Sequence, residues 1–261
     1  MSESVYETIL MHFKFLFFLS IAFLFYYDRS FLIEALLKTH SAEISQILVF
    51  GAGLCFAITP FLYKNKTLNT IFIIICLILY FFTYKLALFN TDPINPLYRQ
   101  WSQVSIFWVM LFLALHRYIG AKSVIFLIHF VLVYSFFSAG ISKLRNEVSW
   151  INGYTLSYYM SFRAMNLNLL NQIEFFSNLT VMRVFSILII AFELLTPLSL
   201  FSKKASVIFF ISTVSFLIIS MVLIDIYWLK YCWMIFSIFP IVWYHDYRQS
   251  EPRRKSLTLL S

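Results

Sequence analysis

Two ionisable residues lie in or beside stretches of this chain that are otherwise apolar. Lys143 follows directly after the apolar residues 122–142, and Glu193 lies well inside the apolar residues 181–201. A charged side chain at such a depth is costly, so it serves as an interfacial anchor, joins helices or takes part in chemistry. An ammonium held away from water gives up its proton more readily, and the resulting amine can act as a base.

Each residue also has a plainer interpretation. A lysine at the end of an apolar helix suits the helix dipole and reaches lipid headgroups, and local chemistry alone favours this anchoring role for Lys143. Glu193 can be a hydrogen-bonded side chain that joins two helices. Pro197, four residues on, cannot donate a hydrogen bond to the backbone carbonyl of Glu193 and leaves it free for a polar contact. Both alternatives stay open for Glu193.

Other catalytic chemistries find little support in the sequence. Cys55, Cys76 and Cys232 lie in apolar stretches without a C-x-x-C pair and are expected to pack as small hydrophobes. The five histidines have no metal-binding spacing, and five glycines leave no phosphate-binding loop. We therefore expect no metal site.

Composition predicts an all-α, polytopic membrane helix bundle. The 261 residues are 61% hydrophobic and only 12% charged, which is too little polar surface for a globule in water. Hydropathy indicates about eight spans of near membrane length, the fourth being short. The expected spans are residues 9–27, 44–63, 69–89, 104–115, 122–142, 181–201, 205–224 and 228–244.

The charges of the loops predict the topology. Every second loop carries only Lys or Arg, as in Lys64/Lys66, Arg117/Lys122 and Lys203/Lys204, and the tail at residues 245–261 is basic. This pattern predicts a multi-pass protein of the cell membrane with both termini in the cytoplasm. Residues 143–180 then lie on the opposite side, which is the outer side, or the lumenal side in an internal membrane. The pattern also accounts for most of the net charge of +8, so no nucleic-acid partner is needed. The aromatic residues 154–176 predict short interfacial helices between spans five and six.

The sequence after the fifth span resembles a known family. Its pattern A-G-x-x-K-L followed by W-x-x-G is formed by Ala139, Gly140, Lys143, Leu144, Trp150 and Gly153, and a second motif, FELLTPLSLF, contains Glu193. These motifs resemble the HTTM superfamily, to which the vitamin K-dependent γ-glutamyl carboxylases belong. The resemblance is sharp over residues 134–200, and the expected layout of spans extends it to a single HTTM-like domain over residues 1–261.

The resemblance implies a role for Lys143. In the carboxylases the corresponding lysine is the base that couples oxygenation of vitamin K hydroquinone to carboxylation of a peptide glutamate, and Glu193 would be its polar partner. This chain departs from the carboxylases in lacking a large lumenal domain after the last expected span. It also has no histidine in LYRQWSQVSIFWV or IFFISTVSFLI, where family members tend to have one.

Two functions therefore stay open, both in a lipid bilayer. The first is an enzyme acting at the outer face on a reduced quinone, such as vitamin K hydroquinone, or on an exported peptide, with Lys143 as the base. Shorter HTTM proteins resemble components that mature secreted bacterial peptides, which suits this length. The second is a non-catalytic scaffold, immunity or export factor for a secreted peptide. A transporter is less supported, because no internal repeat is found.

Overall fold

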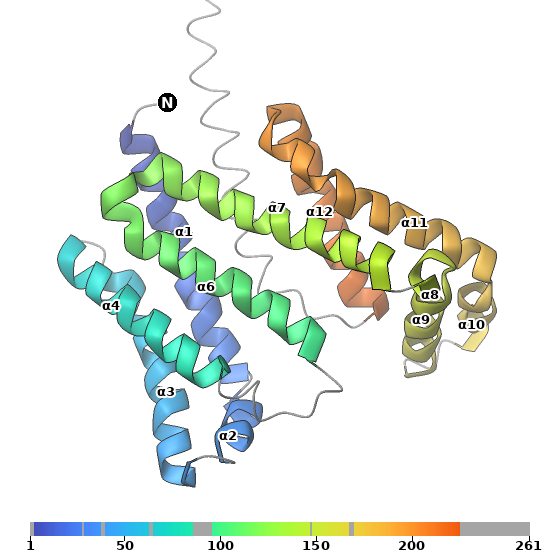
Figure 1. The fold of residues 1–261 in the computed structure, drawn as a ribbon. Coiled ribbons are helices and arrows are strands. Elements are labelled where there is room, and N and C mark those ends of the chain that lie inside the picture. Colours follow the sequence, from blue (N-terminus) through green and yellow to red (C-terminus); the bar gives the residue numbers. More distant parts are fainter. Residues whose placement is uncertain are drawn as a thin grey trace, which may run out of the picture. The chain divides into compact units, whose positions relative to one another are not determined.

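The computed structural model describes residues 3–27, 29–37, 40–62, 65–85, 96–146, 148–166 and 170–224 (Figure 1). Over these residues the chain is helical and has no strand, which confirms the predicted all-α class. The chain divides into two compact units whose boundary, between Val131 and Leu132, falls inside a long helix, α7 (Ala121–Asn146).

Two helices of the first unit, α3 and α4, start at side-chain caps. Ser41 caps α3 by accepting a hydrogen bond from the Ile44 amide, and Asn65 caps α4 in the same way from the Leu68 amide. Besides the first part of α7, the unit contains α1 (Glu3–Tyr27), α2 (Arg29–Leu37), α3 (Ala42–Ile58), the 3-10 turn η1 (Thr59–Leu62), α4 (Lys66–Tyr80), the π-helical turn η2 (Phe81–Lys85) and α6 (Pro96–Ile119).

Aromatic rings form the core of this unit. Phe18 and Phe25 of α1 both contact Phe56 of α3, with ring centroids 6.3 and 4.9 Å apart. Tyr80, at the end of α4, contacts Phe25 and Phe56 in turn. All four side chains are nearly or fully buried, so three helices share one aromatic core.

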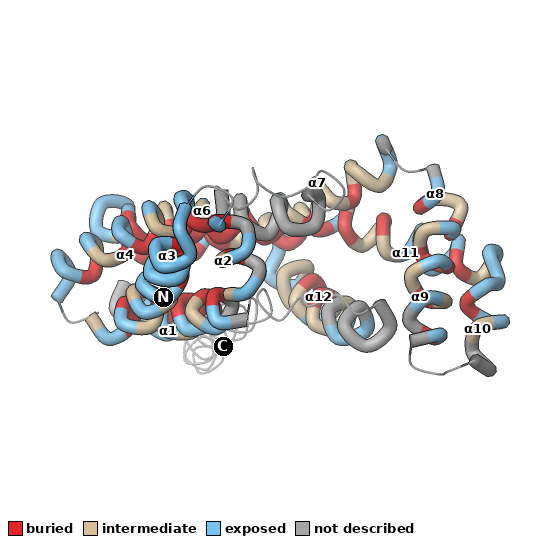
Figure 2. Tube along the Cα trace, turned by 90° about the horizontal axis from the view of Figure 1, so that it is seen from below, coloured by how far each residue is buried: buried red, intermediate tan, exposed pale blue. Residues whose placement is uncertain are grey.

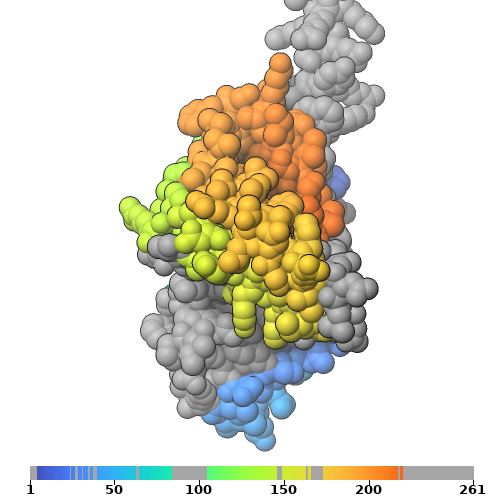
Figure 3. Space-filling view, turned by 90° about the vertical axis from the view of Figure 1, so that its right-hand side faces the viewer, coloured from blue at the N-terminus to red at the C-terminus, as the bar shows by residue number. Residues whose placement is uncertain are grey.

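The second unit combines long apolar helices with short crossing ones. In addition to the end of α7 it contains α8 (Val148–Ile151), α9 (Tyr154–Asn166), α10 (Leu170–Ser177), α11 (Leu179–Leu195), the 3-10 turn η3 (Thr196–Leu200) and α12 (Lys203–Ile224). Two views show α9 and α10 running across the direction of α11 (Figures 1 and 2). In the space-filling view the side chains of α10 and α11 adjoin on one face (Figure 3).

Three helices of the second unit meet around phenylalanine rings. Phe136 of α7 contacts Phe192 of α11 and both Phe209 and Phe216 of α12, with ring centroids 5.8 to 6.4 Å apart. Phe192 also contacts both rings of α12. Since Phe192 directly precedes Glu193, this cluster fixes the part of α11 that carries the carboxylate.

The protein is a multi-pass membrane protein by the length and hydropathy of its helices. Five helical stretches in the described residues are long and apolar enough to cross a bilayer: Val5–Phe23, Ala42–Leu62, Lys66–Thr83, Ala121–Arg145 and Leu179–Leu200. The expected spans at 104–115 and 205–224 fall on α6 and α12, which are not among those five, and the one at 228–244 lies outside the described residues.

The fourth expected span corresponds to a much longer helix than the sequence indicated. We expected residues 104–115, whereas α6 runs from Pro96 to Ile119 over 24 residues. Hydropathy indicates only which residues are apolar enough for the hydrocarbon of a bilayer. It does not indicate where a helix ends, because polar residues such as Arg99, Gln103 and Arg117 have high helix propensity. The helix therefore continues beyond the apolar stretch at both ends.

We predict that Gly153→Ala destabilises the second unit. Gly153 has a φ of +81°, and an added Cβ would lie 2.5 Å from the Arg183 backbone nitrogen of α11. Backbone strain and the clash together should lower the free energy of unfolding by about 1–3 kcal/mol, measured by thermal unfolding in lipid nanodiscs.

Gly51→Ala is the matched control. Gly51 is an exposed residue in the interior of α3, and an added Cβ meets no atom within 4 Å. Alanine is the better helix former by about 0.5–1 kcal/mol, so this variant should be as stable as the parent or more so. Equal losses in both variants would contradict the argument.

Candidate functional site

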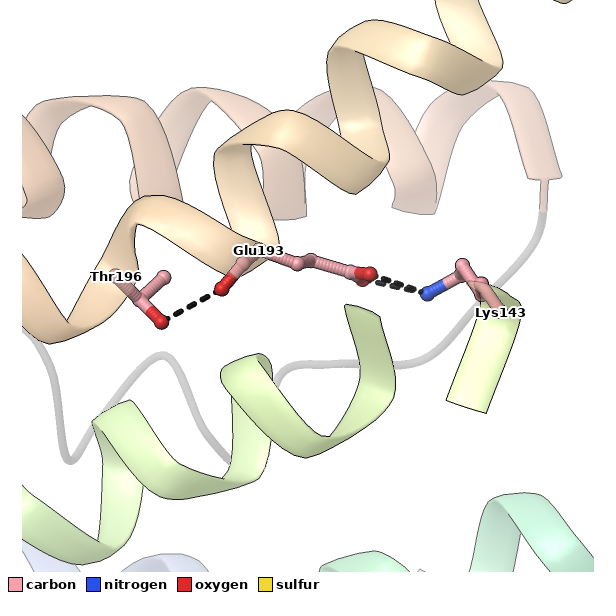
Figure 4. A network of polar contacts seen from close by, with 3 residues as sticks. All are labelled: Lys143, Glu193 and Thr196. Atoms are coloured by element: carbon pink, nitrogen blue, oxygen red, sulfur yellow. Dashed lines mark hydrogen bonds and ion pairs between the residues drawn. The ribbon is translucent and has the colours of Figure 1, made fainter. Parts of the chain in front are cut away.

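An ion pair between α7 and α11 is the centre of the candidate site (Figure 4). Lys143 Nζ donates hydrogen bonds to Oε1 and Oε2 of Glu193, at 2.6 and 2.7 Å. The Glu193 side chain is only 3% exposed and that of Lys143 16%. The two residues singled out by their position in apolar stretches therefore contact each other, and the lysine is the more accessible of the two.

Gly140 allows the two helices to cross at this pair. A Cβ added to Gly140 would lie 3.0 Å from the Cβ of Glu193 and 3.3 Å from side-chain atoms of Leu194. Because glycine has no side chain, α11 comes close to α7 here, and the Glu193 side chain reaches Lys143, three residues along α7 from Gly140. The small residue noted in the sequence thus has a definite neighbour.

Trp150 of α8 lies beside the ammonium. Its ring centroid is 5.1 Å from Lys143 Nζ, within the range of a cation–π interaction. The indole is nearly buried, in a cluster that joins α8 and α9 to α11 through Leu156, Met160 and Met182. The lysine is therefore held by a carboxylate and an aromatic face together.

A proline and a threonine shape the far end of the site. Pro197 has no N–H for the carbonyl of Glu193, and the Thr196 hydroxyl donates to that carbonyl instead, at 2.7 Å (Figure 4). The same hydroxyl lies 3.3 Å from the backbone carbonyl of Val133 in α7. Regular α-helix ends at Leu195 and the 3-10 turn η3 follows directly, so the helix changes its hydrogen-bond pattern just after the carboxylate.

Three further residues of the A-G-x-x-K-L and W-x-x-G motif, namely Gly153, Ala139 and Leu144, differ in their burial and in what surrounds them. Gly153 lies against the backbone of Met182 and Arg183 in α11, where only a glycine fits. Ala139 is partly buried, and the side chain of Leu144 is exposed. The motif therefore brings the ion pair, its aromatic cover and two close helix contacts into one place.

The chemistry available here is proton transfer. Moving one proton from Nζ to a carboxylate oxygen turns an ammonium and a carboxylate into an amine and a carboxylic acid, with no net change in charge. Poorly solvated surroundings reduce the cost of the neutral state relative to the ionic one. The described residues contain no group of three or more metal-ligating side chains. Within them Cys55 and Cys76 are free thiols, and Cys232 lies outside.

A second polar cluster was missed at the sequence level. Glu7 and Lys14 of α1 both contact His116 of α6. Two weak features of the sequence pointed to this cluster. Glu7 and Lys14 are seven residues apart and so share a face of α1, and Lys14 is a charged residue within an apolar stretch. Nothing in the sequence named the partner 102 residues away.

Comparisons with known proteins do not identify a family. No protein-family profile, no curated protein and no solved structure matches the chain. The resemblance to the HTTM superfamily accordingly stays a prediction from the motif residues. The geometry of the ion pair stands independently of it.

We predict that the two charges of the site are strongly coupled. Lys143→Met or Glu193→Gln alone leaves the other group buried without its partner, which should lower the free energy of unfolding by about 3–5 kcal/mol. The double variant should cost much less than the sum of the two. A double-mutant cycle of denaturant unfolding in mixed micelles measures this, and additive losses would show that the pair is not coupled.

Proposed function

We propose that this membrane protein is an enzyme in which Lys143 acts as a base at the outer face of the membrane. The observation that carries the proposal is the pair of short hydrogen bonds from Lys143 Nζ to both oxygens of the buried Glu193. A buried ion pair is often no more stabilising than apolar residues of similar size. Its presence between two apolar helices therefore favours a chemical role.

The substrate classes are a reduced quinone, such as vitamin K hydroquinone, or an exported peptide, as the HTTM resemblance implies. Lys143 passes its proton to Glu193 and becomes a neutral amine, and that amine then removes a proton from a substrate hydroxyl. The site ends with both groups protonated and the substrate as its anion, so protons and charge balance. The accessible side of the lysine and the nearby Trp150 ring offer a surface for a flat substrate.

The helices α8–α10 fit an interfacial position in this proposal. Tyr154, Tyr158, Phe162 and Met165 form one stripe along α9, each more than half exposed, while Leu156 and Met160 are buried. Tyrosine and phenylalanine on an amphipathic helix suit the headgroup region. Since α9 is connected within a few residues to the apolar helix α7, this stripe stays near the membrane surface.

A non-catalytic scaffold is the second candidate, favoured by one observation. Lys143 already donates to both oxygens of Glu193, which is also what a pair that only locks α7 to α11 would do. In that case a secreted peptide or lipid would bind elsewhere, for example on the exposed stripe of α9. The two functions differ in what a change at Lys143 does to activity.

We predict that Lys143→Arg strongly slows oxidation of reduced quinone by the purified protein. Arginine keeps the ion pair with Glu193 but is not deprotonated, so the base is lost while the fold is kept. We expect a fall in rate of about 100-fold or more, the usual contribution of a general base. The assay follows consumption of vitamin K hydroquinone under oxygen.

Arg145→Lys is the matched control. Arg145 is exposed and lies two residues from Lys143 on the same helix, so the reverse exchange should leave the rate unchanged. Full activity in Lys143→Arg would exclude the catalytic role. A parent protein that oxidises no quinol but binds a secreted peptide would favour the scaffold.

A further inference from the structure

Glu7, His116 and Lys14 form a continuous chain of hydrogen bonds between α1 and α6 in the first unit. Nε2 of His116 lies 3.2 Å from Oε1 of Glu7, and Nδ1 of the same ring lies 3.1 Å from Nζ of Lys14. The His116 side chain is 15% exposed and Glu7 38%. The chain of contacts therefore begins at the surface and ends at a lysine in an apolar stretch.

The partners fix the protonation state of the ring. An ammonium has only hydrogens to donate, so Nδ1 must be an unprotonated acceptor. A carboxylate only accepts, so Nε2 must carry the hydrogen. The geometry is thus that of a neutral His116 in its Nε2–H form, with each nitrogen matched to its neighbour.

The charges around the ring oppose a second proton. Burial, which keeps water from a charged imidazole, is the largest effect against the second proton; Lys14 of α1 and Lys66, at the start of α4, add repulsion, whereas Glu7 attracts the charged ring. Glu7 is more exposed, so water weakens its attraction more than it weakens the repulsion from Lys14. Protonation would also remove the acceptor at Nδ1 and bring an N–H against the ammonium. One hydrogen bond is lost and one like-charge contact appears.

We propose that Glu7, His116 and Lys14 are a proton-binding site that joins α1 to α6 while His116 is neutral and releases them when the ring takes up a proton. An unfolded chain has neither the lost hydrogen bond nor the repulsion. The stability of the first unit therefore falls as the pH drops through about 6.5, where an imidazole ordinarily takes up its proton. The site makes the contact between these two helices sensitive to acid on the side of the membrane where α1 begins.

The test is the thermal midpoint of helix loss in lipid nanodiscs at pH 7 and at pH 5. For the parent we expect a midpoint several degrees lower at pH 5. In His116→Gln the amide can still donate to Glu7 and accept from Lys14 but cannot take up a proton, so most of this fall should disappear. Lys14→Met removes the repelling cation and should reduce the fall as well, which keeps the test decisive if the glutamine variant does not fold.

His12→Gln is the matched control. His12 is an exposed histidine of the same helix, with Nδ1 at 2.8 Å from the carbonyl of Thr8, and the variant should keep the full pH effect of the parent. The proposal is overturned if the midpoint of the parent is equal at the two pH values. It is also overturned if either His116→Gln or Lys14→Met, once folded, loses as much stability in acid as the parent does.

Discussion

A carboxylate and an ammonium placed among apolar helices must meet each other, because neither finds enough water there to stay charged alone. This constraint organises the second unit. Gly140 brings the helices close enough for Glu193 and Lys143 to join, Trp150 covers the ammonium, and Thr196 satisfies the carbonyl that Pro197 cannot. Each of these residues contributes to the surroundings of the ion pair.

The first unit meets the same constraint with an extra residue. Glu7 and Lys14 are two turns apart on α1, too far along the axis for a direct pair, and the imidazole of His116 bridges them. A histidine between the charges makes the connection depend on its own protonation, which a direct lysine–glutamate pair does not. Both units therefore pair charged side chains between apolar helices, and we expect only the pairing through His116 to weaken in mild acid.

Much of the fold followed from the sequence, because apolar stretches of membrane length leave the backbone no alternative to helix. The close approach at Gly140 and the freed carbonyl before Pro197 were also predictable, since both are consequences of a single residue type. The ends of α6 were not, because polar residues such as Arg99 and Gln103 mark the limit of hydrocarbon and still continue a helix. His116 was missed because contacts between residues 102 positions apart leave no local pattern.

The separation of 50 residues between Lys143 and Glu193 has a consequence for biosynthesis. Lys143 is synthesised before its carboxylate partner, and at that stage it is, like Arg145, a cation in the last turn of α7. A lysine there can extend to the headgroups and hold the new helix at its proper depth. Its bonds to the carboxylate of Glu193 can form only after α11 has also been made. An anchor during insertion and a partner in the finished protein are then successive states of one residue.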